Sequence, residues 1–162
     1  MKTLFLLRHA KSSWENASLH DFDRPLNKRG LNAAPFMGEK ILYNRFQIDS
    51  IVSSPAERAK QTAILVKETA IIDSSIQYDK RIYEAAAHHL LEVVSETGED
   101  KNSVMLVGHN PGMEELVKIL TGEIQRMPTA ALAVIDLRIN RWSEISKDCG
   151  KLRNLIRPKD EM

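Results

Sequence analysis

Histidine and arginine side chains follow apolar runs that lie far apart in this sequence. Arg8 and His9 come directly after one apolar run, and His109 comes just after a second run at residues 104–107. Arg58 belongs to a third segment, near the start of an expected helix. Arginine carries a planar fork of N–H donors that matches the oxygens of a phosphoryl group. An unprotonated imidazole nitrogen is a competent nucleophile toward phosphorus.

Together, these residues could hold a phosphoryl group and accept it covalently. Phosphoryl transfer asks a protein mainly for in-line positioning and for neutralisation of the equatorial oxygens. The two arginines and one of the two histidines would supply that neutralisation without a metal ion. The sequence holds no convincing set of metal ligands, because His88 and His89 are helical neighbours that point in different directions and no HExxH or clustered CxxC motif occurs. We therefore expect no metal and no other cofactor.

The apolar pattern along the chain predicts the elements that must bring these residues together. Short apolar runs bounded by turn signals indicate strands buried on both faces, and helical spacing of apolar residues indicates helices. The expected strands cover residues 3–7, 48–53, 79–83 and 104–107, a terminal β-hairpin covers 131–137 and 142–146, and the tail at 152–158 is expected to pack on the sheet edge. The expected helices cover residues 27–43, 55–69 and 85–96, with a further helix after Pro111.

This alternation predicts an α/β fold, a three-layer α/β/α sandwich whose sheet is mostly parallel with an antiparallel edge from the hairpin. The segment Ser54-Pro55-Ala56-Glu57 has the form of a capping box with proline at the first helical position. Pro35 lies inside the first helix, where it either kinks the helix or delays its start. Polar groups just past the C-terminal ends of parallel strands lie where such sheets bind ligands. Helices that open near Pro55 and Pro111 would aim their N–H groups at the same crevice.

Length and charge limit the kind of protein. The chain has 162 residues, which suits one domain over residues 1–162 with a core that needs no disulfides. Its single cysteine, Cys149, cannot form an internal disulfide. The net charge of +1 favours neither nucleic acid nor a membrane surface as a partner. The N-terminal apolar stretch is too short for a signal peptide or a membrane-spanning helix, so a cytoplasmic protein is expected.

Four segments resemble, in order, the motifs of one known family. Residues 6–11 read Leu-Leu-Arg-His-Ala-Lys, residues 23–30 contain Arg-Pro-Leu and end in Arg-Gly, residues 53–63 run from Ser-Ser-Pro to Gln-Thr-Ala, and residues 107–112 read Val-Gly-His-Asn-Pro-Gly. Together they resemble the signature of the histidine phosphatase superfamily, also called the phosphoglycerate mutase-like superfamily. The Arg-His-Ala form is that of its short phosphohistidine phosphatase subgroup, typified by SixA. The pattern spans nearly the whole chain, which makes it far more specific than any single motif.

The resemblance implies a role for each principal residue. His9 would be the nucleophile and would form a transient phosphohistidine. Arg8, Arg58 and His109 would complete the phosphate pocket. Asn110 would orient His109 or the loop backbone.

Glu84 and Ser12 are further candidates, each with a plain alternative. Many members of the family use a carboxylate as the acid for the leaving group, and Glu84 is the natural candidate here. A solvated carboxylate at a helix start explains Glu84 equally well. Ser12 either lines the pocket or simply belongs to a polar loop. If the substrate is phosphohistidine, its leaving imidazole can be protonated before transfer, so an acid matters less than for an alkoxide.

The sequence therefore predicts a metal-independent phosphatase that works through a phosphohistidine on His9. The preferred substrate is phosphohistidine on a protein partner, either a phosphohistidine carrier or the phosphotransfer domain of a histidine kinase. The first alternative is a phosphomonoesterase or mutase of the same superfamily that acts on small phosphate esters, and the second is a non-catalytic phosphate-binding module. Relatives that act on small metabolites usually carry a long insertion as a lid, and the stretch between Arg58 and His109 leaves little room for one.

Overall fold

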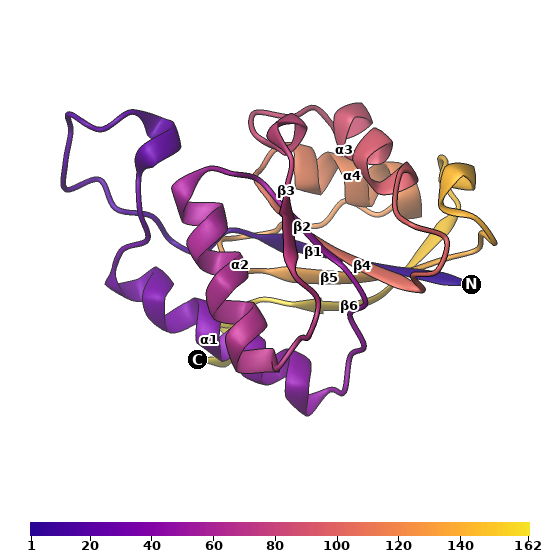
Figure 1. Cartoon of the computed structure of the whole chain (residues 1–162), viewed down its shortest axis with the longest axis horizontal. Helices are drawn as coiled ribbons and strands as arrows, with labels where there is room; N and C mark the ends of the chain where they lie inside the picture. The colour runs from indigo at the N-terminus through magenta and orange to yellow at the C-terminus, as the bar shows by residue number, and fades with distance from the viewer.

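A six-stranded sheet with helices on both faces forms the protein (Figure 1). The computed structural model describes residues 1–162. The strands are β1 (Lys2–Arg8), β2 (Ile51–Ser53), β3 (Ile76–Tyr78), β4 (Ser103–Gly108), β5 (Leu132–Leu137) and β6 (Gly150–Ile156). The helices are α1 (Lys28–Tyr43), α2 (Glu57–Ala70), α3 (Ala87–Ser95), α4 (Gly112–Thr121) and the short α5 (Pro158–Glu161).

The strand order is β3-β2-β4-β1-β5-β6. The sheet is parallel from β3 through β1, whereas β5 runs antiparallel to both β1 and β6. Helices α1 and α2 cover one face, and α3 and α4 cover the other, as Figure 1 shows. The expected three-layer sandwich, with a mostly parallel sheet and an antiparallel edge, is therefore confirmed.

The middle of each central strand is apolar because both faces of the sheet are buried there. In β1, Leu4 and Leu6 belong to the core cluster on the side of α3 and α4, and Phe5 and Leu7 belong to the cluster on the side of α1 and α2. All four residues are at most 2% exposed. Burying a side chain of this size contributes about 2 kcal/mol, so a polar residue inside the strand would be costly. After this apolar run, the next polar residue is Arg8, where the strand ends.

The strand β3 lies earlier in the chain than the pattern predicts. The expected strand at 79–83 is wrong, because Lys80–Ile82 form a 3-10 turn. Asp79 starts that turn, since its side chain accepts a hydrogen bond from the Arg81 amide at 2.9 Å. A local bond of this kind offers the backbone an alternative to pairing in a sheet.

The second strand of the expected terminal hairpin is β6, and the expected strand at 142–146 is wrong. Trp142 begins a 3-10 turn, its side chain is fully buried, and its Nε1 donates to the Lys101 carbonyl at 2.9 Å. The apolar residues of this segment therefore pack into the core, and the segment does not pair as a strand. The tail at 152–158 packs on the sheet edge as expected, because most of it belongs to the edge strand β6.

The start of α1 agrees with the prediction, whereas the start of α2 differs from it. α1 runs through Pro35 without a break, so the proline does not delay its start. α2 has Ala56 as its N-cap residue and no side-chain cap. The expected capping box at Ser54 is wrong, because the Ser54 amide donates to the Val107 carbonyl at 2.9 Å rather than to the Glu57 side chain. The Ser54 hydroxyl contacts the His109 ring.

Gly30 allows α1 to approach the segment after β1 closely. A side-chain carbon at this position would overlap the Lys11 carbonyl oxygen, which already accepts from the Asn27 amide at 2.9 Å. We expect Gly30→Ala to lower the free energy of unfolding by about 2–3 kcal/mol, as measured by urea denaturation. Glu39→Ala, an exposed change in the same helix, is the control. Equal stability of the two variants would show that α1 can move away from Lys11 without cost.

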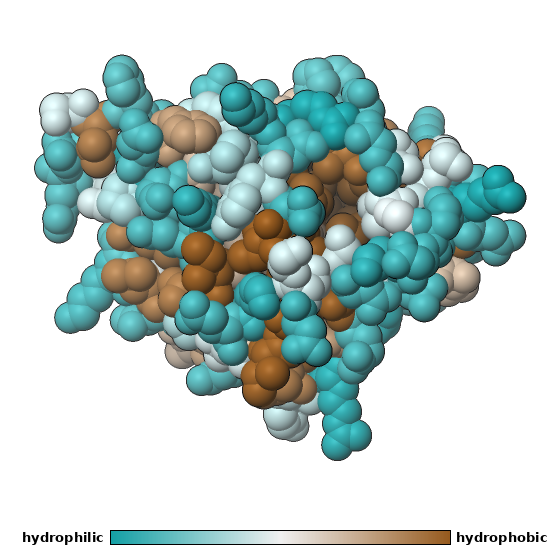
Figure 2. Space-filling view, viewed as in Figure 1, coloured by the Kyte–Doolittle hydropathy of each residue, from teal (hydrophilic) through white to brown (hydrophobic).

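The charge of the chain is nearly balanced, with 23 basic and 22 acidic side chains. On the face shown in Figure 2 most of the surface is hydrophilic, and the hydrophobic patches are separate. None of the helices combines the length and the apolar character that crossing a membrane requires.

Candidate active site

The candidate residues that follow β1 and β4 meet because these strands are parallel neighbours. Arg8 ends β1 and pairs with Gly108, the last residue of β4. The His9 amide donates to the Gly108 carbonyl at 3.0 Å, and the centroids of the His9 and His109 rings lie 5.0 Å apart. The expected meeting of the two histidines at the carboxyl edge of the sheet is therefore confirmed.

His9 is held in one tautomer by the backbone of its neighbour. Its Nδ1 lies 2.7 Å from the Ala10 carbonyl oxygen. A carbonyl oxygen can only accept, so Nδ1 carries the proton and Nε2 keeps its lone pair. Burial lowers the pKa of His9 to about 3, although the hydrogen bond to Ala10 acts in the opposite direction. The imidazole is therefore neutral at neutral pH and has the free nitrogen that a nucleophile needs.

His109 is also neutral, and Ser54 holds it. Its Nε2 lies 2.8 Å from Ser54 Oγ, and the same oxygen accepts from the Ala56 amide at 3.2 Å. The Ser54 side chain is buried, and Nε2 is the one acceptor within reach of its hydroxyl proton, so the hydroxyl donates to Nε2 and the ring proton lies on Nδ1. Burial lowers the pKa of His109 to about 4, the charge of Arg58 adds to this effect, and the charge of Asp21 opposes it.

The buried side-chain polar atoms without a hydrogen-bond partner all belong to candidate residues of this site. They are Arg8 Nε, Arg58 Nε, His109 Nδ1 and Asn110 Oδ1. A buried polar group without a partner costs about 1–3 kcal/mol, so such groups are few in a folded protein. Their concentration beside the paired histidines indicates a pocket that a ligand completes. All of these atoms except the Asn110 oxygen are donors, which suits an anion.

Arg8 and Arg58 use their Nη atoms for contacts with the protein and leave Nε free. Arg8 Nη1 donates to the Met127 carbonyl at 3.1 Å. Arg58 Nη1 donates to the Asp21 carbonyl at 2.7 Å, and Arg58 Nη2 donates to the Asp21 carboxylate at 3.0 Å. Two guanidinium groups held in this way beside neutral imidazoles present donors of the kind that match the oxygens of a phosphoryl group.

Asn110 joins the site through the loop backbone. Its Nδ2 donates to Glu114 Oε2 and to the Met127 carbonyl, both at 2.9 Å. Glu114 Oε2 also accepts from the Met127 amide at 2.7 Å. The Met127 carbonyl is the group that holds Arg8, so this geometry fits the second of the two roles expected for Asn110, orientation of the loop backbone.

Ser12 and Glu84 lie at the margin of the site, and the structure brings the other five candidate residues together. Ser12 is buried, and its hydroxyl accepts from Arg24 Nη1 at 2.6 Å. Ser12 therefore holds a loop arginine. Glu84 is exposed, with its backbone in the left-handed region at φ 53°. It follows Tyr83, whose ring packs edge-on against His109 with centroids 5.6 Å apart.

Asp21 and Tyr83 also belong to the site, although the sequence reasoning did not single them out. The Tyr83 hydroxyl donates to Asp21 Oδ2 at 2.6 Å. Burial alone would raise the pKa of Asp21, but hydrogen bonds from Tyr83, Arg24 and Arg58 hold it well below its usual range, so the carboxylate is ionised. Burial and the bond to Asp21 raise the pKa of Tyr83 to about 12. No local spacing rule connects residues so far apart in the chain.

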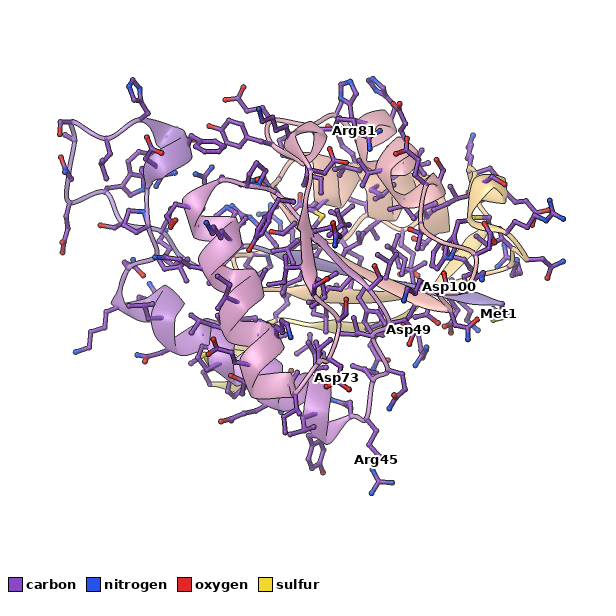
Figure 3. All side chains as sticks on the ribbon, viewed as in Figure 1. Met1, Arg45, Asp49, Asp73, Arg81 and Asp100 are labelled. Carbon is purple, nitrogen blue, oxygen red and sulfur yellow. The ribbon has the colours of Figure 1, made fainter.

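A large hollow of the surface lies elsewhere. It has a volume of about 740 Å³ and is lined by residues from the loops at the opposite edge of the sheet, none of them a histidine. Figure 3 labels Arg45, Asp49, Asp73 and Asp100 around it, on the other side of the view from the loop that carries Asp21. Its lining carries both acidic and basic side chains, but it lacks the paired arginines and histidines of the site at the carboxyl edge.

The low pKa values of His9 and His109 predict a loss of stability in acid. The unfolded chain takes up protons on both rings near their ordinary pKa of 6.5, whereas the folded protein keeps them neutral to about pH 4. The unfolded state thus binds more protons, and the free energy of unfolding falls as the pH drops from 6.5 toward 4. Urea denaturation at neutral pH and at about pH 4.5 measures this fall. The double variant His9→Asn/His109→Asn should lose less stability, and an equal loss would contradict neutral buried histidines.

Comparison with known sequences agrees with this geometry. The model of the histidine phosphatase superfamily (branch 1) matches residues 4–92. An uncharacterized chloroplastic protein of Arabidopsis thaliana is 30% identical over 97% of this chain and 78% of its own length. An uncharacterized protein of Mycobacterium tuberculosis is 29% identical over 90% of this chain and 96% of its own length.

Solved structures share the same fold. The crystal structure of a candidate phosphohistidine phosphatase SixA from Agrobacterium tumefaciens superimposes with a TM-score of 0.84 at 31% identity, covering 97% of this chain and 98% of that one. A protein histidine phosphatase SixA complexed with tungstate has a TM-score of 0.85 at 23% identity, covering 99% of each chain. A mycobacterial glucosyl-3-phosphoglycerate phosphatase has a TM-score of 0.69 at 18% identity, covering 95% of this chain and 98% of that one.

Proposed function

Because this chain belongs to the histidine phosphatase superfamily (branch 1) and has SixA proteins among its structural neighbours, we propose that it transfers a phosphoryl group first to His9 and then to water. The observation that carries this proposal is the set of buried, unpartnered donors on Arg8, Arg58 and His109. They lie beside a neutral imidazole whose Nε2 is free. A nucleophile next to donors without partners is the arrangement that phosphoryl transfer requires.

In the first step, the lone pair of His9 Nε2 attacks phosphorus while the bond from phosphorus to the leaving group breaks. The guanidinium Nε–H groups of Arg8 and Arg58 donate to the equatorial oxygens. In the second step, water attacks phosphorus, and the electron pair of the P–N bond returns to His9. The oxygen of water stays on the product, which leaves as dihydrogen phosphate and equilibrates with the solvent. Neither step requires a base stronger than neutral imidazole.

The same groups make a metal ion unnecessary in the proposed reaction. Two arginines and the Nδ1–H of His109 supply positive charge and donors for the phosphoryl oxygens. This is the contribution that Mg²⁺ makes in enzymes that transfer phosphoryl groups from nucleotides. We expect EDTA to leave the activity unchanged.

Phosphohistidine on a protein is the substrate that fits the site best. No carboxylate forms a hydrogen bond with either catalytic ring, and Glu84 is exposed. An alkoxide leaving group would need an acid beside the leaving-group oxygen to protonate it. The ring of a phosphohistidine protonated on its other nitrogen leaves as a neutral imidazole and needs none. The relative from Agrobacterium tumefaciens, itself described as a candidate phosphohistidine phosphatase, supports the same class.

The connection between α2 and β4 also supports a substrate presented by a protein, such as a phosphohistidine carrier or the phosphotransfer domain of a histidine kinase. It contains only the short strand β3, a 3-10 turn and α3. No long insertion closes over the histidines from this side. A phosphoryl group on the surface of a partner therefore has an approach to His9.

The test compares phosphate release from a phosphorylated histidine phosphotransfer domain and from p-nitrophenyl phosphate, with EDTA present throughout and His9→Ala as the control. Fast release from the phosphotransfer domain, lost in the variant, supports the proposal. Fast release from the small ester alone would move the protein to the phosphomonoesterases and make Glu84→Gln the next variant to measure. No release from either would contradict the proposed function.

A further inference from the structure

Asp21 joins three separate parts of the site through one carboxylate. It lies in a 3-10 turn, Asp21–Asp23, of the long loop between β1 and α1. Figure 1 shows this loop, in indigo, extending beyond the sheet and returning beside the start of α2. Asp21 Oδ2 accepts from Arg58 Nη2 at 3.0 Å and from the Tyr83 hydroxyl at 2.6 Å. Asp21 Oδ1 accepts from Arg24 Nη2 at 2.9 Å and from Arg24 Nε at 3.2 Å.

The contacts between Asp21 and Arg58 determine where the rest of that guanidinium points. The Asp21 carbonyl binds Arg58 Nη1 at 2.7 Å while the carboxylate binds Nη2. A guanidinium group is planar and rigid, so fixing both Nη atoms also fixes the direction of Nε–H. That Nε is buried and has no partner in the protein. We propose that Asp21 is a positioning residue that aims Arg58 Nε at the phosphoryl group.

This proposal rests on the proposed function. It adds that the Asp21 carboxylate orients Arg58 before the phosphoryl group binds. Arg8 is held through one atom only, because its Nη1 donates to the Met127 carbonyl, and its Nε is likewise free. Both arginines of the pocket thus contact the protein through Nη and keep a buried Nε without a partner. For Arg58, both Nη atoms are engaged, so Nε is the atom that remains for the phosphoryl oxygens.

The surroundings of Asp21 require a carboxylate in particular. Every polar side chain that contacts it is a donor, and the donors approach both of its oxygens. An asparagine at this position would place its NH₂ group against one of these sets of donors. Arg24 is itself held by the Ser12 hydroxyl at 2.6 Å, and its guanidinium carbon lies 3.6 Å from the centroid of the Trp14 ring. We call the contacts of Asp21 with Arg58 the clamp. Arg24, which is itself held in place, supports the Asp21 side of this clamp, although 48% of the Asp21 side chain is exposed.

The first experiment measures inorganic phosphate binding by calorimetry and kcat/KM with the best substrate for Asp21→Ala. Arg58 loses its orientation in this variant, so we expect phosphate to bind about tenfold more weakly and kcat/KM to fall about a hundredfold. Asp23→Ala removes an exposed carboxylate from the same turn and should stay within about twofold of wild type. Tighter phosphate binding by Asp21→Ala would overturn the proposal, because Asp21 would then compete with the ligand for Arg58.

A second experiment separates positioning of Arg58 from a general effect on the fold. If Asp21 acts through Arg58, Asp21→Ala should change kcat/KM by less than about twofold when Arg58→Ala is already present. An equal fold-change with and without Arg58 would overturn the proposal. Asp21→Asn keeps one acceptor oxygen, so its kcat/KM should lie between that of wild type and that of Asp21→Ala. If circular dichroism shows that Asp21→Ala is unfolded, Asp21→Asn takes its place in both experiments. Phosphate binding still tests the positioning of Arg58 if wild type releases no phosphate from any substrate, a result that would contradict only the proposed function.

Discussion

We expect phosphate release by the His9→Ala variant to fall at least about ten-thousandfold below that of wild type. The variant removes the only nitrogen in the pocket that is both free and able to attack. His109 cannot replace it, because its Nε2 is engaged by the Ser54 hydroxyl and its Nδ1 carries the ring proton. The two arginines still bind phosphate in the variant, so the loss appears in kcat rather than in KM.

The measurement that separates the chemical role of His9 from binding is a single turnover with labelled phosphoryl donor and an alkaline quench. An alkaline quench preserves a phosphohistidine, and an acid quench destroys it. Wild type should show label on the protein after the alkaline quench only, and His9→Ala should show none. His88→Ala, an exposed histidine on α3, is the matched control and should behave as wild type. Label on the His9→Ala protein would contradict His9 as the nucleophile.

The part of the site that could be predicted from the sequence is the part that parallel strand pairing determines. The apolar runs before Arg8 and before His109 mark strands buried on both faces, and such strands meet at their carboxyl ends. The pairing of Arg8 with Gly108 then brings the two histidines side by side. Arg58 follows from the same logic, because its helix begins just after the neighbouring strand β2.

The elements that could not be predicted depend on contacts with the rest of the fold. Trp142 lies in an apolar segment that looks like a strand, but its buried indole bonds to the Lys101 backbone and the segment turns instead. Asp21 lies in a polar loop that has no periodic pattern. Its contacts with Arg58 and Tyr83 join positions far apart in the chain, and they exist only after the sheet and α2 have formed.

Arg58→Ala should lower kcat/KM about a thousandfold, the second-largest effect we expect, because it removes a fixed donor aimed at developing charge in the transition state. The Arg58 side chain is only 7% exposed, so water does not replace its guanidinium well. The loss should appear with phosphohistidine and with small esters alike, since both present the same phosphoryl oxygens. Arg45→Ala, at the hollow on the opposite edge of the sheet, is the control and should match wild type.

Arg58→Lys decides whether charge or direction matters more at this position. Lysine keeps the positive charge but replaces the planar fork with a flexible ammonium group that cannot bond to Asp21 and to the ligand in the same geometry. We expect this variant to recover less than about tenfold of the activity lost in Arg58→Ala. Steady-state kinetics and competitive inhibition by inorganic phosphate measure both changes. Full recovery by lysine would mean that charge alone suffices, and the clamp formed by Asp21 would then have no catalytic purpose.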